Sequence, residues 1–424
     1  MIYDIKNEFS KCYSTLVQHI PVLEDALLSW RASFILKKYR SRREHYENVC
    51  KEQSLVYSEH STIEAVRKCL KGRGWTVRRK NLGGVHTFAF VPRVSWHSAL
   101  LDELYFLGRV SEFDYASQGY VVKDLYQAKN STLLEEMNKK AFNNIIEVHR
   151  NDPIDWIFIY ASGAEISPNL LLRIKNETGI PCVIMCLDDK QSWEFGMPLN
   201  THRKGQIDLA KHIDLAWTSS RVACSWYLAE GGRPIYLPEG VNTNIYCPKN
   251  VGQDISVSFV GQSYGFRESV VRFLKKGKVK VQCFGNGWQS RAVSTEKIVD
   301  IYRRSRIILG MGGVGWSEYL TNVKGRDFEV PCTGGGMYLT SFNPDLALHF
   351  DVGREIVCYR SRDEMLELIR YYISHQEEAR EIAKAGRVRC LNEHRWLHRY
   401  IKICKILGIF EDSVSFLKYS ENRD

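Results

Sequence analysis

The chain has 424 residues, of which 44% are hydrophobic and 25% charged, a composition typical of a soluble globular protein too long for one hydrophobic core. Its formal net charge of +10 favours anionic partners such as nucleoside diphosphates, nucleic acid, lipopolysaccharide or anionic lipid. The 12 cysteines form no C-x-x-C pair, and the N-terminus carries Asp4, Lys6 and Glu8 where a signal peptide would be apolar. We therefore expect a cytoplasmic protein with reduced cysteines and neither a disulfide framework nor a metal site.

Residues 1–80 are predicted to form a helical, basic N-terminal extension. Apolar residues recur at helical spacing over residues 23–49. The same segment carries a cluster of cations: Lys37, Lys38, Arg40, Arg42 and Arg43. One interpretation is an amphipathic helix that makes a peripheral contact with the inner face of a membrane, or with another polyanion. The other is a helix that packs on the next domain and leaves its basic end in water. No apolar run reaches the roughly 18 residues of a spanning helix.

Residues 81–245 alternate short apolar runs with amphipathic segments, which predicts a Rossmann-like domain with a parallel sheet. The strand expected at residues 182–187 ends in Asp188 and Asp189. In such sheets ligands bind beyond the carboxyl ends of the strands, so we expect both carboxylates on the ligand side. Prolines, a glycine and asparagines over residues 237–248 then mark a crossing between domains.

A second alternation over residues 246–400 predicts another Rossmann-like domain, and residues 401–424 are expected to form a helical tail. Two expected strands of this domain end in Gly261 and Gly285, small residues that let a ligand approach the backbone. Residues 311–315 are expected to form a flexible loop. The predicted fold is therefore α/β, with two doubly wound domains that face a cleft and a helical extension before them.

The stretch from Lys324 to Thr340 has the layout of a pocket for phosphate and sugar. A helix that starts near Arg326 would present free N–H groups and a positive dipole end to an anion, with Lys324 adding charge beside it. Glu329, about one turn later, could accept hydrogen bonds from sugar hydroxyls. Gly334 begins a glycine run that closes the segment. The alternative is a helix with a solvated basic start and a glycine cap. No P-loop is present.

These residues resemble the C-terminal half of the GT-B glycosyltransferases of the spore-maturation-protein type. The matching segments are Gly325 to Glu329, Gly334 to Gly336, Phe342 to Leu346 with His349 and Phe350, Gly353 to Ile356 with Tyr359, Ala385 to Arg387, and Glu393 with His394. Ser258 to Gly261 with Arg267, and Phe284 to Trp288, resemble the first two strand ends of the same domain. The likeness is good over residues 254–400, fainter over residues 150–248, and not seen before about residue 85.

The resemblance implies that the C-terminal domain binds a nucleoside-diphosphate sugar, for example a UDP-sugar, and that the N-terminal domain binds the acceptor. Glu329 matches the second glutamate of the family's paired-glutamate signature, which holds the ribose, and Arg326 matches the residue that neutralises the diphosphate. Arg267 is a second phosphate candidate. The first glutamate of the pair contacts the donor sugar in the family. Its position in this chain is occupied by Thr321, so the resemblance does not extend to that contact.

Transfer to a hydroxyl also calls for a base near the acceptor when the reaction inverts the sugar. By position, Asp188 and Asp189 are the best candidates, although a turn or a helix cap explains them equally well. Four histidines are alternatives: His202, His212, His349 and His394.

We therefore expect a glycosyltransferase that needs no bound metal or other cofactor, because cations and a helix N-terminus can stabilise the leaving diphosphate. The acceptor would be a polysaccharide, a lipid-linked molecule or another hydroxyl compound. Two alternatives stay open. One is a non-catalytic module of the same fold that binds a nucleotide or glycan. The threonine at position 321, in place of the first glutamate, favours this alternative. The other is a glycosyltransferase that acts on nucleic acid, which the net charge permits.

Overall fold

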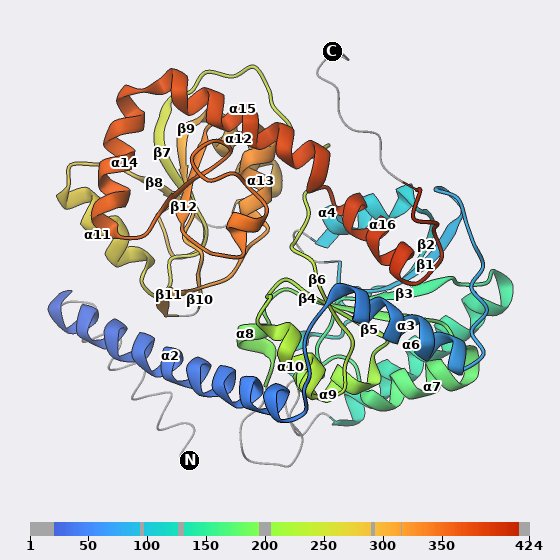
Figure 1. The fold of residues 1–424 in the computed structure, drawn as a ribbon. Coiled ribbons are helices and arrows are strands. Elements are labelled where there is room, and N and C mark those ends of the chain that lie inside the picture. Colours follow the sequence, from blue (N-terminus) through green and yellow to red (C-terminus); the bar gives the residue numbers. More distant parts are fainter. Residues whose placement is uncertain are drawn as a thin grey trace.

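The computed structural model describes residues 21–93, 97–125, 131–194, 205–289, 293–314 and 316–414. They form two α/β domains and a helical N-terminal region that lies against both (Figure 1). Each domain is built on one parallel sheet with helices on both faces. This architecture confirms the predicted fold class, including the helical region at the start of the chain.

The first sheet has six parallel strands in the order β2-β1-β3-β4-β5-β6. All residues of β1, β3, β4 and β5 are buried, as expected for central strands that helices cover on both faces. Successive side chains of β1 enter two separate hydrophobic clusters, one on each face of the sheet. The strands are β1 (Val85–Phe90), β2 (Gly108–Phe113), β3 (Trp156–Ile159), β4 (Cys182–Cys186), β5 (Leu215–Thr218) and β6 (Pro234–Tyr236).

Local sequence sets the helix ends of this domain. Helix α7 begins after Ser167, whose side chain accepts the N–H of Leu170, and it ends at Gly179 with φ of 70°. The helices and 3-10 turns are α4 (His97–Asp102), η1 (Glu103–Phe106), α5 (Val122–Leu125), α6 (Ser131–Asn151), α7 (Pro168–Thr178), α8 (Asp189–Ser192), α9 (Gln206–Leu209), η3 (Ala210–His212) and α10 (Ala223–Ala229).

The long helix α2 (Pro21–Glu52) passes along both domains (Figure 1). On the first domain, the Tyr46 hydroxyl accepts the indole N–H of Trp193 at 2.9 Å and donates to Glu230 at 2.8 Å. On the second, the Arg31 guanidinium lies 4.5 Å from the ring centre of Trp316. The helix therefore packs on the protein, as one of the two interpretations of this segment proposes. Within the described residues, no helix is long and apolar enough to cross a membrane.

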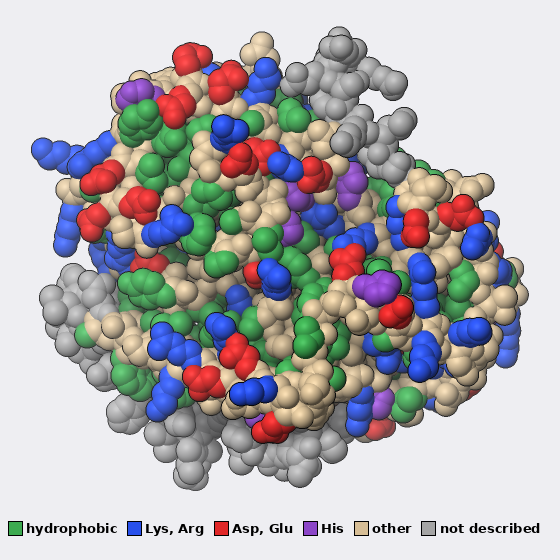
Figure 2. Space-filling view, in the orientation of Figure 1, with side chains coloured by type: hydrophobic (Ala, Val, Ile, Leu, Met, Phe, Trp, Pro, Cys, Tyr) green, Lys and Arg blue, Asp and Glu red, His purple; other side chains and the backbone are tan. Residues whose placement is uncertain are grey.

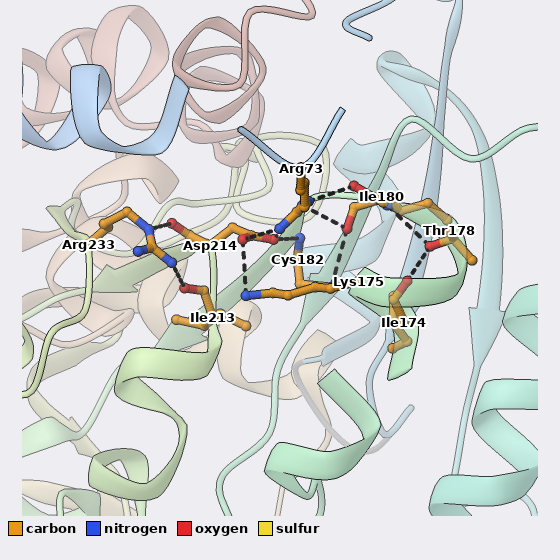
Figure 3. Close-up of polar contacts among 10 residues, drawn as sticks. Arg73, Ile174, Lys175, Thr178, Ile180, Cys182, Ile213, Asp214 and Arg233 are labelled. Atoms are coloured by element: carbon orange, nitrogen blue, oxygen red, sulfur yellow. Dashed lines mark hydrogen bonds and ion pairs between the residues drawn. The ribbon is translucent and has the colours of Figure 1, made fainter. Parts of the chain in front are cut away.

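A buried ion cluster joins helix α3 (Glu59–Gly72) to the first domain (Figure 3). Arg73, at the end of α3, donates two hydrogen bonds to the Asp214 carboxylate at 2.6 and 2.9 Å, and the Lys175 ammonium lies 3.1 Å from the same carboxylate. Burial would raise the pKa of Asp214, but Arg73, Lys175 and the backbone N–H of Cys182 together lower it. The N-terminal region is thus fastened to the first domain.

The second sheet has five parallel strands in the order β13-β12-β9-β7-β8. They are β7 (Ile255–Val260), β8 (Gln282–Phe284), β9 (Ser305–Leu309), β12 (Met337–Ser341) and β13 (Val357–Tyr359). Around them lie α11 (Arg267–Lys276), α12 (Thr295–Arg304), α13 (Arg326–Thr333), η4 (Leu346–Leu348), α14 (Arg362–Ser374) and α15 (Gln376–Glu393).

Two features of this half differ from the sequence predictions. Residues 311–315 were expected to be a loop, but β10 (Gly313–Val314) pairs with β11 (Ser317–Thr321) in an antiparallel hairpin. The boundary predicted between residues 400 and 401 falls inside α16 (Trp396–Ile406). This helix returns to the first domain, where Trp396 and Tyr400 pack on the sheet beside Trp217. The chain therefore crosses between the domains twice.

Candidate functional site

A pocket of about 370 Å³ lies between the domains, where the carboxyl ends of both sheets face each other. The first domain contributes Tyr160, Leu187 and Asp188 to its wall, and the crossing contributes Glu239 and Tyr246. The second domain contributes the remaining lining residues: Val260, Gly261, Arg267, Thr295, Ile298, Tyr302, Met311, Lys324, Gly325, Arg326 and Glu329. Six of the predicted site residues therefore share one pocket: Asp188, Gly261, Arg267, Lys324, Arg326 and Glu329.

Two guanidinium groups converge at the end of β7. A Cβ on Gly261 would lie 3.1 Å from Arg326 Nη2 and 3.4 Å from Arg267 Nη1. Both guanidiniums also lie near the Phe259 ring, at 5.4 and 5.5 Å from its centre. Within the described residues, neither forms an ion pair with a carboxylate. Burial and the charge of Arg326 lower the pKa of Arg267 to about 10. Two cations held together, with no carboxylate of the described residues at ion-pair distance, form a site for an anion.

The loop before α13 places the rest of the basic wall. Asp327 accepts the backbone N–H of Lys324 at 2.8 Å and the hydroxyl proton of Tyr338 at 2.6 Å, which ties the first turn of the helix to β12. Lys324 and Arg326 consequently stand at the positive end of the helix dipole. Glu329, one turn later, faces the same pocket. Burial raises the pKa of its carboxyl, while a hydrogen bond with Tyr246 opposes this rise.

The two neighbouring aspartates after β4 occupy different environments. Asp188 lines the pocket, and its carboxylate accepts a hydrogen bond from Lys324 Nζ across the domain junction at 3.0 Å. Asp189 is fully buried and does not line the pocket. Its carboxylate accepts hydrogen bonds from Thr218 and, at 2.8 Å, from Tyr227. Burial raises its pKa to about 6. Asp189 is thus a structural residue behind the pocket, and only Asp188 has access to a ligand.

Two predicted donor-binding glycines also lie outside the pocket. Gly285 supports the β7 loop from behind, since a Cβ there would meet the Gly261 carbonyl oxygen at 2.6 Å. Gly334 is at the far end of α13 with φ of 59°, and a Cβ on it would lie 2.8 Å from the Arg387 side chain. Its role is to end the helix, as the alternative interpretation of this stretch proposed.

None of the described histidines that we considered as bases lines the pocket. His394 and His349 lie together under α13, where His394 Nε2 is 2.9 Å from the His349 carbonyl oxygen. Burial lowers the pKa of His349 to about 3. His212 is in η3, away from the junction, and His202 lies outside the described residues. Within the described residues, no group of three or more His, Cys, Asp or Glu side chains is arranged to hold a metal ion.

Sequence reasoning missed Glu239, Tyr246 and Tyr302. Glu239 is 7% exposed and belongs to the crossing, where the prolines and glycine indicated a linker between the domains. Tyr246 follows in the same segment, and Tyr302 lies on α12 with a helical pattern that indicates a core residue. The burial of Glu239 depends on distant segments, so no local sequence signal could have identified this part of the site.

Comparisons with known proteins agree with this geometry. Residues 267–405 match the family model described as glycosyl transferase-like. No curated protein matches the chain. Among solved structures, sucrose-phosphate synthase from Thermosynechococcus elongatus has 11% identity and a TM-score of 0.51, over 76% of this chain and 98% of that one. The Anabaena protein HepE, in complex with UDP and glucose, has 11% identity and a TM-score of 0.51, over 76% of this chain and 99% of that one.

At such low identity the solved structures show the fold alone. The class that they and the pocket define is the two-domain GT-B fold. The family match adds that the C-terminal domain is glycosyl transferase-like in sequence. The resemblance to the C-terminal half of GT-B glycosyltransferases is therefore confirmed over residues 267–405.

Proposed function

We propose that the chain is a glycosyltransferase that moves a sugar from a nucleoside-diphosphate sugar to a hydroxyl of an acceptor, which is a glycan, a lipid-linked molecule or another hydroxyl compound. The observation that carries the proposal is the pair Arg267 and Arg326, which meet at Gly261 without a carboxylate partner in the described part of the chain. A diphosphate supplies the charge that this pair lacks. The N-terminus of α13 and Lys324 add to the same field.

In this reaction the acceptor oxygen attacks the anomeric carbon of the donor, and the bond from that carbon to the phosphate oxygen breaks. The bonding electrons stay on the leaving nucleoside diphosphate, whose growing charge Arg267, Arg326 and Lys324 stabilise without a metal ion. The acceptor proton must leave the oxygen, and we propose that Asp188 accepts it, since it is the pocket carboxylate of the acceptor domain. Glu329 is proposed to bind the ribose.

The first test is ligand binding by calorimetry and thermal shift with UDP, GDP, ADP and dTDP. UDP comes first because HepE, a protein of the same fold, has been solved with it. A charge-assisted hydrogen bond contributes about 1.5–3 kcal/mol, so Arg326→Ala should weaken diphosphate binding roughly 10- to 100-fold. Arg354→Ala, on an exposed side chain, is the matched control and should have no effect. Equal affinity in the Arg326 variant and the wild type would refute the pocket assignment.

A non-catalytic binding module of the same fold is the second candidate, and Thr321 favours it. This residue stands where the resemblance places the first glutamate, and it does not line the pocket. Its carbonyl oxygen accepts a hydrogen bond from Lys190 of the first domain at 2.6 Å. A transferase should slowly hydrolyse its sugar nucleotide when no acceptor is present, and addition of EDTA should not stop it. Tight binding without any turnover, in the presence of cell extract as a source of acceptors, would favour the module.

We also propose that α2 contacts an anionic membrane surface. Trp30 and Phe34 are 66% and 63% exposed, and their rings stack at 6.4 Å. At about 100° per residue they lie opposite the buried face of Leu28 and Tyr46, with Lys37 and Lys38 on their own side. Aromatic rings beside lysines suit a lipid interface. On the face shown in Figure 2, acidic and basic side chains are interspersed without one large basic patch, so the proposed contact depends on α2 itself.

Sedimentation with vesicles, with and without phosphatidylserine, tests this contact. The full chain should bind the anionic vesicles at low salt and dissociate from them at high salt. Trp30→Ser with Phe34→Ser should abolish binding, whereas Ser33→Ala on the same helix should not. Binding that survives the double substitution would refute the role of α2.

A further inference from the structure

Glu239 is a buried carboxyl group that faces the pocket without a partner. Its side chain lines the pocket and the residue is 7% exposed. Across the described residues, its carboxyl forms neither a hydrogen bond nor an ion pair. A buried polar group left unpaired is costly, and proteins rarely keep one without a use.

The backbone around Glu239 is fixed on both sides, which holds the base of its side chain at the pocket. The buried guanidinium of Arg399 donates to the carbonyl oxygens of Pro238 and Glu239, each at 3.2 Å. Val241 donates its N–H to the His394 carbonyl at 2.9 Å. A Cβ on Gly240 would lie 2.6 Å from the backbone nitrogen of Trp396, so the crossing packs directly on the start of α16.

The site also reserves space for this carboxyl. Gly325 has an ordinary helical conformation, φ −50° and ψ −39°, that any residue can adopt. A Cβ at this position, however, would lie 2.6 Å from Glu239 Oε2 and 3.6 Å from Glu329 Oε1. A side chain at this position would therefore crowd the Glu239 carboxyl, although the backbone conformation would allow one. The glycine lets the Glu239 carboxyl of the crossing approach the N-terminus of α13 beside the Glu329 carboxyl of the helix itself.

The charges around Glu239 favour its neutral form. Burial raises its pKa well above the usual value, and the carboxylates of Asp188 and Glu329 raise it further, while Lys324 opposes them. A neutral carboxyl group both donates and accepts hydrogen bonds, as sugar hydroxyls do. It also avoids the repulsion that an ionised carboxylate would meet beside a diphosphate.

We propose that Glu239 binds the sugar of the donor, through a hydrogen bond with one of its hydroxyl groups, and thereby selects which sugar is accepted. This inference rests on the proposed function. The diphosphate site is on the second domain at Arg267 and Arg326, and Thr295, Ile298 and Tyr302 of α12 line the pocket on that domain. Glu239, on the crossing, lies among Asp188 of the first domain and Lys324 and Glu329 of the second, so its carboxyl stands between the diphosphate site and the first domain, where the part of the donor beyond the phosphates would lie.

The experiment compares each nucleoside diphosphate with its sugar conjugates by calorimetry. For the diphosphate that binds best, the conjugates with glucose, galactose and N-acetylglucosamine are measured, and the tightest is used. Loss of one hydrogen bond predicts that Glu239→Ala weakens this conjugate roughly three- to tenfold and leaves the diphosphate unchanged. Glu239→Gln, which keeps a neutral donor and acceptor, should retain most of the affinity. Glu377→Ala, on an exposed side chain, is the control.

Each other outcome counts against the inference. Equal weakening of diphosphate and conjugate would place Glu239 at the nucleotide, and no weakening of either would leave it without a ligand. A wild-type protein that binds no conjugate more tightly than its diphosphate would also overturn it. If Arg326→Ala does not weaken diphosphate binding, the proposed function is refuted, regardless of the results for the Glu239 variants. If Glu239→Ala does not fold, Glu239→Asp withdraws the same carboxyl by one methylene and should show the same selective loss.

Discussion

Two buried glutamates at the domain junction differ in what surrounds them. Glu103, in η1, accepts hydrogen bonds from the Arg395 guanidinium at 2.9 Å and from the Leu397 N–H at 2.8 Å. Glu239, on the crossing, is nearly as buried but has no hydrogen-bond or ion-pair partner in the described part of the chain. Burial raises the pKa of both carboxyls. The difference indicates that one glutamate holds α16 to the first domain, while the other is available to a ligand.

The largest effect expected from this comparison is on stability. Glu103→Ala removes the buried carboxylate that accepts hydrogen bonds from Arg395 and from the Leu397 N–H, which costs about 3 kcal/mol. For a domain of this size, that lowers the melting temperature by roughly 6–12 °C. Glu239→Ala breaks no hydrogen bond of the side chain, so its melting temperature should stay close to the wild-type value. Differential scanning calorimetry of the two variants makes the measurement. A large loss of stability in Glu239→Ala would show that its carboxyl has a structural partner after all.

An intermediate effect concerns the pH dependence of ligand binding. Burial raises the pKa of Glu239. The nearby carboxylates of Asp188, Glu329 and Asp327 raise it further, and Lys324 lowers it. The neutral form is proposed to bind the sugar, so the preference for a sugar nucleotide over its diphosphate should fall as the pH rises through this pKa. The expected loss is up to about tenfold. Glu239→Gln does not titrate and should remove the pH dependence, measured by calorimetry from pH 6 to 9. A dependence that survives in this variant would assign the titration to another group.

The same shift has a consequence for folding. A carboxyl whose folded pKa is raised adds stability that is fully present below its unfolded pKa of about 4.3 and is lost as the pH rises through the folded value. Glu239→Gln should therefore be more resistant than the wild type to unfolding at alkaline pH.

The fold could be predicted from the sequence because its signals are local. Alternating apolar runs define the strands, and residues such as Ser167 and Gly179 mark the ends of a helix within a few positions. The β10–β11 hairpin escaped detection because a glycine-rich strand has few side chains that indicate a sheet. The return of α16 to the first domain depends on distant contacts, such as Trp396 with Trp217, that no local pattern reveals.

The site could be predicted only in part, for a similar reason. Arg326 and Glu329 follow from a helix start, and Gly261 follows from a strand end. Asp188 and Asp189 are adjacent in sequence, and only the beginning of α8 decides that one faces the pocket and the other faces Tyr227. Glu239 stands out solely because distant segments fix its backbone and leave its carboxyl unpaired.

The smallest effect is expected from a single methyl group. Gly325→Ala adds a Cβ at 2.6 Å from Glu239 Oε2, and the flexible end of the glutamate can shift to make room. The helical conformation at this position suits alanine, so the folded protein should be about 0.4–1 kcal/mol more stable. Binding of the sugar nucleotide should weaken about threefold because the carboxyl is displaced, and diphosphate binding should not change.

Gly334→Ala is the matched control: its φ of 59° disfavours alanine, so it should lose stability and keep both affinities. In the Glu239→Ala background, Gly325→Ala should have no further effect on binding, since the two substitutions act on one group. Additive losses in that double variant would show that Gly325 acts on the ligand directly, and not through Glu239.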